Sequence, residues 1–180
     1  MTQPAHPRGS ATAPLKGRGV TTFSLCFLAA LVEGFDLQSA GVAAPRFGPA
    51  YGLDPAMLGW VFSSNTFGLF LGAAIGGGVS DRVGRRAVLI VSMFLFGVFS
   101  LGTASSPSAE TFIAMRFLTG LGLGGALPNI VSMTAETGSP DNRALNVTLI
   151  SAGMPLGGAL AGALALFGPT LDWKVIFWVG

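Results

Sequence analysis

The sequence predicts an all-α integral membrane protein, and three observations lead to this fold class. Hydrophobic residues make up 51% of the 180 residues and charged residues only 10%, a balance typical of membrane proteins. The apolar residues form long runs, and each run is close to the roughly 20 residues that a helix needs to cross a bilayer. Charged and turn-forming residues stand between the runs. We therefore expect five complete transmembrane helices and the opening turns of a sixth.

The apolar runs follow one another closely along the chain. The expected helices cover approximately residues 20–45, 56–80, 87–104, 111–133 and 144–167, and a truncated helix covers 173–180. Residues 1–19 are rich in Pro, Gly, Ala, Ser and Thr and contain no acid, which predicts a disordered cytoplasmic tail. A cleaved signal peptide is the alternative, but the further apolar spans favour an uncleaved first helix. A chain that stopped inside the sixth helix would leave backbone groups unsatisfied in lipid, so we expect a fragment of a longer protein.

The distribution of basic residues predicts how the chain is oriented. Cytoplasmic loops of membrane proteins carry an excess of Lys and Arg. With the N-terminus inside the cell, the inner segments contain Arg8, Lys16, Arg18, Arg82, Arg85, Arg86 and Arg143, and the outer segments contain Arg46 and Lys174. The sequence therefore predicts a cytoplasmic N-terminus. The net charge of +2 is too small, and the basic residues too scattered, to indicate binding to nucleic acid.

Two acidic residues interrupt the first apolar run, in the stretch Glu33-Gly-Phe-Asp36. At positions i and i+3 they share one face of a helix. A carboxylate inside the bilayer costs on the order of a few kcal/mol, so such residues normally face a bundle interior or a water-filled cavity and mark an ion or proton path. Desolvation and mutual repulsion favour the protonated form of at least one of them. The pair is a candidate proton-coupling site, and the alternative is a structural acid held by a neighbouring helix.

The fourth apolar run contains an arginine, Arg116. At about 1.5 Å per residue, Asp36 lies about 22 Å from the inner end of the first span and Arg116 about 25 Å from the inner end of the antiparallel fourth span. We therefore expect Arg116 to face Asp36, or both acids, as a charge partner or as a site for a substrate carboxylate. Glu136 follows about 30 Å further along and is expected at the cytoplasmic mouth. Gln38 and Asn129 are expected to line the cavity, because both are polar.

Spaced glycines follow Arg116. Gly120 and Gly124 form the pattern G-x-x-x-G, which allows two membrane helices to approach closely, and Gly122 is expected to serve helix packing as well. Gly120, Gly122 and Gly125 also fit the dinucleotide-binding pattern G-x-G-x-x-G. That site requires a preceding strand, and the neighbouring apolar runs are too long for strands. The glycines are therefore expected to serve helix packing.

Three patterns resemble signatures of the major facilitator superfamily. The first is G-x-x-x-D-R-x-G-R-R between the second and third spans, where glycines allow a tight turn and arginines hold the loop at the cytoplasmic surface. The second is Arg116 with its glycines, and the third is a Gly-Pro pattern on the fifth span, where proline bends the helix and glycine permits close contact. The first and third are carried by Gly77, Asp81, Arg82, Gly84, Arg85, Arg86, Gly153, Pro155 and Gly158.

Within that superfamily the sequence resembles the aromatic acid:H+ symporter family. The resemblance is carried by Glu33-Gly-Phe-Asp36, Ala126-Leu-Pro-Asn129 and Phe177-Trp-Val-Gly180. It implies the N-terminal half of a twelve-helix fold built from inverted three-helix repeats. Many members have aspartate in place of Glu33, so the role of proton carrier transfers more directly to Asp36, with Glu33 tuning it. The loop containing Asp81 would govern alternating access.

The same resemblance implies a function. The protein would take up an aromatic carboxylate, such as a hydroxyphenylpropionate or a related hydroxylated aromatic acid, across the bacterial inner membrane. The proton gradient would drive uptake, and no cofactor is implied. The expected partners are the acid, H+, the lipid bilayer and the missing C-terminal half of the transporter.

Three alternative functions remain open. A membrane enzyme would need a nucleophile with a base, or a cluster of metal ligands, but His6 is the single histidine and lies in the polar tail, while Cys26 is the single cysteine. We therefore expect neither enzymatic activity nor a metal site. The second alternative is symport of another organic acid, such as benzoate or a dicarboxylate. The third is a membrane remnant that transports nothing.

Overall fold

The computed structural model describes residues 17–135, 143–167 and 172–179, and this part of the chain contains helices and no strands. The helices are α1 (Gly17–Ala50), α2 (Pro55–Val83), α3 (Arg85–Ala104), α4 (Ala109–Ala135), α5 (Arg143–Ser151), α6 (Gly153–Phe167) and α7 (Lys174–Val179). Within the described residues, five segments are long and apolar enough to cross a membrane, and α5 and α6 together form the fifth. The predicted all-α membrane fold is confirmed.

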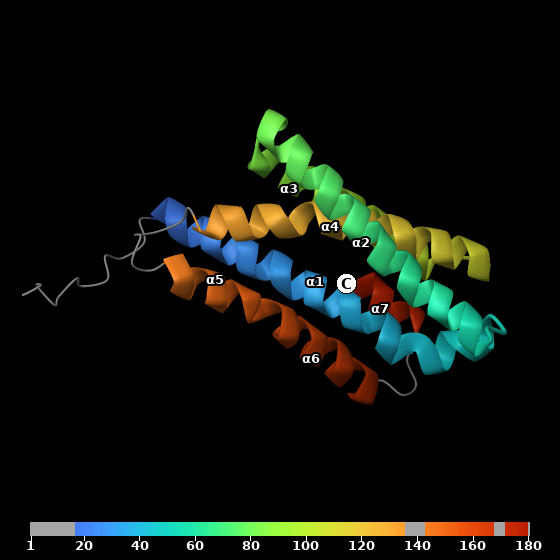
Figure 1. Ribbon diagram of the computed structural model, residues 1–180. Helices are drawn as coiled ribbons and strands as arrows, with labels where there is room; N and C mark the ends of the chain where they lie inside the picture. The colour runs from blue at the N-terminus through green and yellow to red at the C-terminus, as the bar shows by residue number, and fades with distance from the viewer. Residues whose placement is uncertain (1–16, 136–142, 168–171, 180) are drawn as a thin grey trace, which may run out of the picture.

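Two helices, α1 and α4, occupy the centre of the arrangement. Helices α2 and α3 pack on α4, while α6 packs along α1 on the opposite side, and α1 and α4 contact each other between these two groups (Figure 1). The short helix α7 contacts α1, α3 and α6. Half of the buried polar side chains of the described chain, including its buried acidic and basic groups, belong to α1 and α4. The fold therefore keeps these groups away from the surrounding lipid.

Glycines allow α4 to approach α2 and α3 closely. A Cβ atom at Gly120 or Gly124 would overlap with the backbone carbonyl oxygen of Asn65 or Leu69 on α2. A Cβ atom at Gly122 would lie 2.7 Å from a backbone nitrogen of α3. The close approach expected from the glycine pattern is therefore present, and α4 uses the pattern against two neighbouring helices at once.

The contact between α1 and α6 also depends on small residues. A Cβ atom at Gly153 would lie 3.0 Å from the carbonyl oxygen of Phe27, and one at Gly158 would lie 2.7 Å from Cγ of Gln38. Gly157 has the tightest position, because its Cβ atom would overlap with a backbone oxygen of α1. The fifth span therefore lies against the first with almost no side chain between the two backbones.

The fifth span differs from the single helix that was predicted over residues 144–167. The structure divides it at Ala152 into α5 and α6. Pro155 has no N–H group to donate to the carbonyl of Ser151, so the regular hydrogen bonding of the helix is interrupted there. The Ala152 N–H still donates to the carbonyl oxygen of Thr148 at 3.1 Å, which keeps the two parts in line as one span.

The first span also differs from its predicted boundary. It was expected to end at Pro45, but α1 continues to Ala50 with Pro45 and Pro49 inside it. Phe47 in this extension is fully buried and packs against Phe112, with 4.8 Å between the ring centroids. Burial of this ring stabilises the last turns of the helix, although each proline removes one backbone donor.

The predicted charged loop over residues 77–86 is much shorter than expected. Helix α2 continues to Val83 and α3 begins at Arg85, so Gly84 alone separates them. Gly84 has φ 97° and ψ 139°, a conformation that glycine adopts far more easily than other residues. The charged residues on either side are compatible with a helix, and only the glycine breaks it. The predicted ends at residues 80 and 87 were therefore wrong by a few residues.

An aromatic cluster joins the ends of α1, α4 and α7. It consists of Phe47, Tyr51, Phe112, Trp173 and Phe177, whose ring centroids lie 4.8–6.1 Å apart in seven contacting pairs. The Tyr51 hydroxyl donates a hydrogen bond to the carbonyl oxygen of Ser106 at 2.6 Å. Burial raises the pKa of this hydroxyl above its usual value, and the carboxylate of Asp172 adds to the effect. The hydroxyl therefore stays protonated and remains a donor.

Two glycines of α2, one packed against α4 and one in open space, give a test of the close contacts between the helices. Gly72→Ala would press a methyl group onto the carbonyl oxygen of Leu121 on α4, which we expect to cost about 1–3 kcal/mol of stability. Gly59→Ala, on the same helix, meets no atom within 4 Å and should be neutral or stabilising by up to about 1 kcal/mol. Thermal unfolding of the purified full-length protein in detergent measures both. Equal effects of the two substitutions would contradict the contact.

Candidate functional site

An ion pair connects the two central helices. Nη1 of Arg116 on α4 donates hydrogen bonds to both carboxylate oxygens of Asp36 on α1, at 2.9 and 3.0 Å. Each side chain is only 1% exposed. The contact that was predicted from the depth of the two residues in their helices is therefore present. Because both side chains are buried away from water, this ion pair is the strongest electrostatic contact between α1 and α4 in the described chain.

Glu33 lies one turn before Asp36 on α1 and is fully buried. Neither of its carboxylate oxygens has a hydrogen-bond partner among the described residues. An ionised carboxylate without a partner is very costly in such surroundings, so the neutral form of Glu33 is the one that this conformation accommodates. The two acids therefore have different environments, since Asp36 is paired with a cation and Glu33 is not.

The guanidinium group of Arg116 has a second neighbour. Its Cζ atom lies 5.7 Å from the centroid of the Phe177 ring on α7, within the range of a cation–π interaction. Its Nε–H has no hydrogen-bond partner in the described part of the protein. The cation is therefore held by one carboxylate and one aromatic ring, and it keeps a donor that is not in use.

The other predicted polar residues have different positions. Asn129 is 1% exposed and donates from its Nδ2 to the carbonyl oxygen of Gly125 at 2.8 Å, whereas Gln38 is exposed and lies beside α6. Asp81 is exposed in the last turn of α2, on the helix end that Gly84 terminates. Glu136 lies outside the described residues. The structure thus brings Asp36 and Arg116 together, but it does not bring Gln38 or Asn129 to them.

Two residues of this region were not identified from the sequence. Asn65 on α2 is buried against Gly120, and its Oδ1 has no partner among the described residues. Asn65 is the one amide residue of the second predicted span, in the polar stretch Ser63-Ser-Asn65-Thr66, and that was the available signal. Phe177 was noted only as part of a sequence resemblance, because its contact with Arg116 depends on how α7 packs.

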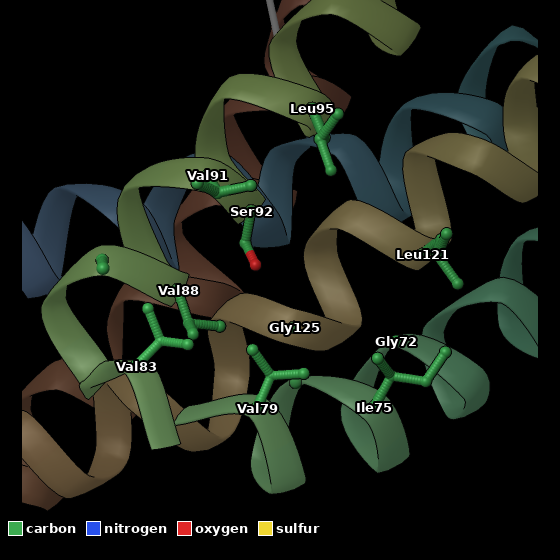
Figure 2. Close-up of a pocket in the computed structure, with 12 residues that line it drawn as sticks. Gly72, Ile75, Val79, Val83, Val88, Val91, Ser92, Leu95, Leu121 and Gly125 are labelled. Atoms are coloured by element: carbon green, nitrogen blue, oxygen red, sulfur yellow. The ribbon is translucent and has the colours of Figure 1, made fainter. Parts of the chain in front are cut away.

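A groove lies where α2, α3 and α4 meet (Figure 2). It has a volume of about 240 Å³. Ser92 is its one polar side chain, and the others are Ile75, Val79, Val83, Ala87, Val88, Val91, Leu95 and Leu121. No charged group lines it, so a substrate carboxylate would meet no cation among these residues. Within the described residues there is also no cluster of three His, Cys, Asp or Glu side chains that could hold a metal ion.

Besides forming membrane helices and a buried ion pair, the chain matches a known protein family in its sequence. Residues 26–180 match the Major Facilitator Superfamily. The chain belongs to this superfamily. Its members are membrane transporters and not enzymes, and the resemblance noted in the three sequence signatures is thereby confirmed. The chain is accordingly a multi-pass membrane protein.

Several relatives carry names that refer to aromatic acids. The chain is 46% identical to the 3-(3-hydroxy-phenyl)propionate transporter of Escherichia coli K12, over 91% of this chain and 40% of that protein. It is 40% identical to the 4-hydroxybenzoate transporter PcaK of Pseudomonas aeruginosa, over 87% of this chain and 35% of that protein. A gallate transporter of Pseudomonas putida is 36% identical, again over 87% of this chain and 35% of that protein. The chain thus spans well under half the length of these relatives.

Solved structures support the fold. The chain resembles the xylose transporter XylE of E. coli in a partially occluded, inward-open conformation, with a TM-score of 0.80. The match covers 89% of this chain and 46% of that chain, at 20% sequence identity. The inward-open conformation of the same transporter gives a TM-score of 0.76. The described helices therefore have the fold of the N-terminal half of a major facilitator transporter, as predicted.

Removing one member of the ion pair gives a second test. Arg116→Met leaves the Asp36 carboxylate buried without a partner, and we expect a loss of about 3–5 kcal/mol of stability. Adding Asp36→Asn to that variant removes the unpaired charge and should restore most of the loss. Thermal unfolding of the purified full-length protein is the measurement. If the double variant is no more stable than the single one, the two residues are not coupled.

Proposed function

We propose that the protein to which this chain belongs is a proton-coupled symporter that takes up a hydroxylated aromatic acid. The observation that carries the proposal is the buried pair of Asp36 and Arg116. Ionisable residues inside a membrane domain are costly and are generally retained for ion or substrate movement. The named substrates of the relatives, 3-(3-hydroxy-phenyl)propionate, 4-hydroxybenzoate and gallate, share an aromatic ring, a hydroxyl and a carboxylate. We take this substrate class for the present protein, with 3-(3-hydroxyphenyl)propionate as the first candidate.

Asp36 is the proposed proton carrier. In the described conformation it accepts two hydrogen bonds from Arg116, as in a charge-assisted pair of a carboxylate and a guanidinium. A proton arriving at Asp36 removes its negative charge, and the attraction between α1 and α4 is then much weaker. The contact can therefore exist in two states, paired and unpaired, and proton binding selects between them.

Arg116 is proposed to link the proton to the substrate. Once Asp36 is neutral, the buried guanidinium lacks a counter-ion, and the carboxylate of an aromatic acid has the charge and the planar geometry to replace it. Proton binding thereby favours binding of the acid, which is the thermodynamic requirement for symport. A neutral Glu33 contributes by adding no second negative charge that would compete for Arg116.

The membrane context belongs to the same proposal. We place the protein in the bacterial inner membrane with its N-terminus in the cytoplasm, because most basic residues between the spans would then lie inside. The joint at Gly84, with Asp81 before it and the arginines after it, would lie on the cytoplasmic side and take part in alternating access. The C-terminal half of the transporter would complete the substrate path, and the proton gradient would supply the energy.

Uptake measurements test the substrate and the coupling ion. Cells that express the complete gene should accumulate labelled 3-(3-hydroxyphenyl)propionate, and a protonophore should abolish the accumulation. Unlabelled benzoate and an unlabelled dicarboxylate are added as competitors. Inhibition of the labelled uptake by either one shows that the transporter also binds that acid. Accumulation that survives the protonophore would rule out proton coupling. Competition by the dicarboxylate alone, without uptake of any aromatic acid, would rule out the substrate class.

Matched substitutions of the two acids test their separate roles. Asp36→Asn removes the ionisable group of the pair, and we expect at least about a tenfold loss of proton-driven uptake together with the loss of its pH dependence. Glu33→Gln replaces a neutral acid by a neutral amide of similar shape, so most of the uptake should remain. Uptake and its pH profile in whole cells are measured for both variants. The assignment is reversed if Glu33→Gln abolishes pH dependence and Asp36→Asn preserves it.

A further inference from the structure

Phe177 is held in a defined position inside the protein. It is 1% exposed, and its backbone carbonyl accepts a hydrogen bond from Oγ of Ser100 on α3 at 3.3 Å. Its ring meets those of Phe112 and Trp173 edge to face, with interplanar angles of 84° and 82°. Edge-to-face contacts of this kind fix the orientation of a ring. The ring of Phe177 therefore has little freedom to turn.

The same ring lies beside the cation of the ion pair. Cζ of Arg116 is 5.7 Å from the ring centroid, and the guanidinium is 1% exposed. The face of an aromatic ring carries partial negative charge and attracts a cation, most strongly where water is excluded. The acidic and basic side chains that are buried in the described chain are Glu33, Asp36 and Arg116. Within that set, Arg116 is the cation that the ring can attract.

We propose that Phe177 is a positioning residue that holds the guanidinium of Arg116 in register with Asp36. Asp36 fixes Nη1 of the guanidinium and leaves Nε without a partner, so the carboxylate does not define the position of the whole group. The ring supplies a second point of attachment from α7. The ion pair between α1 and α4 is thereby connected to a third helix. The effect on transport rests on the proposed function, whereas the contact itself does not.

Phenylalanines with increasing numbers of ring fluorines test the contact in the full-length transporter. Fluorine withdraws electrons from the ring face and weakens its attraction for a cation, with little change in shape. With fluorinated residues at position 177, the thermal unfolding midpoint should fall with each added fluorine. It should not fall in a background that carries both Asp36→Asn and Arg116→Met, where no cation remains. Phe47 is the matched control, because it is fully buried in the same aromatic cluster and has no cation contact among the described residues.

The pH profile of uptake tests the positioning role. A weaker hold on Arg116 loosens the ion pair that proton binding is proposed to break, so uptake should reach half of its maximal rate at a lower proton concentration. The pH of half-maximal uptake should therefore rise by about half a unit to one unit for the most fluorinated ring, a change of about three- to tenfold in proton concentration. If the ring only fills space in the core, the pH of half-maximal uptake stays unchanged.

The two measurements separate the possible failures. Equal fluorine effects in the charged and the neutral background, or equal effects at positions 177 and 47, would overturn the inference about Phe177. A fluorine effect on unfolding without any change in the pH profile of an active transporter would overturn the positioning role. If the unmodified transporter moves no aromatic acid, the proposed function falls, and the unfolding series still decides whether Phe177 binds the cation.

Discussion

The cost of placing charge inside a membrane is the constraint on which this structure depends. Asp36 and Arg116 would each be prohibitive alone in a dry interior, and they become acceptable because α1 and α4 bring them within hydrogen-bond distance. That geometry requires α4 to lie deep among its neighbours. The glycines of α4 make this possible, since α2 and α3 come close enough to enclose it. The small-residue pattern of α4 thus allows the ion pair to be buried.

Much of the fold and the central contact could be predicted because helices have a fixed rise per residue. Counting residues from the predicted membrane boundaries placed Asp36 and Arg116 at similar depths, and the structure brings them together. The same counting could not find helix ends that depend on distant contacts. The first span continues past Pro45 because Phe47 is buried against Phe112 of α4, and no local pattern carries that information.

The rest of the site could not be predicted from the sequence, because the directions of its side chains depend on the neighbouring helices. Gln38 and Asn129 were selected for their polarity, yet Asn129 bonds to its own helix and Gln38 lies beside α6. Polarity alone does not say which way a residue faces on a helix that has neighbours on several sides. The contact of Phe177 with Arg116 was likewise beyond the sequence, because it depends on the position of α7 against α1 and α3.

The single-residue joint at Gly84 has a mechanical consequence. Because Gly84 alone joins α2 and α3, any change in the angle between these two helices must pass through the backbone of that one residue. In contrast, α1 and α6 are distant in the chain and meet through bare backbone, where a Cβ atom at Gly157 finds no room. The half-transporter thus joins one pair of helices through a single flexible residue and another pair through close packing alone.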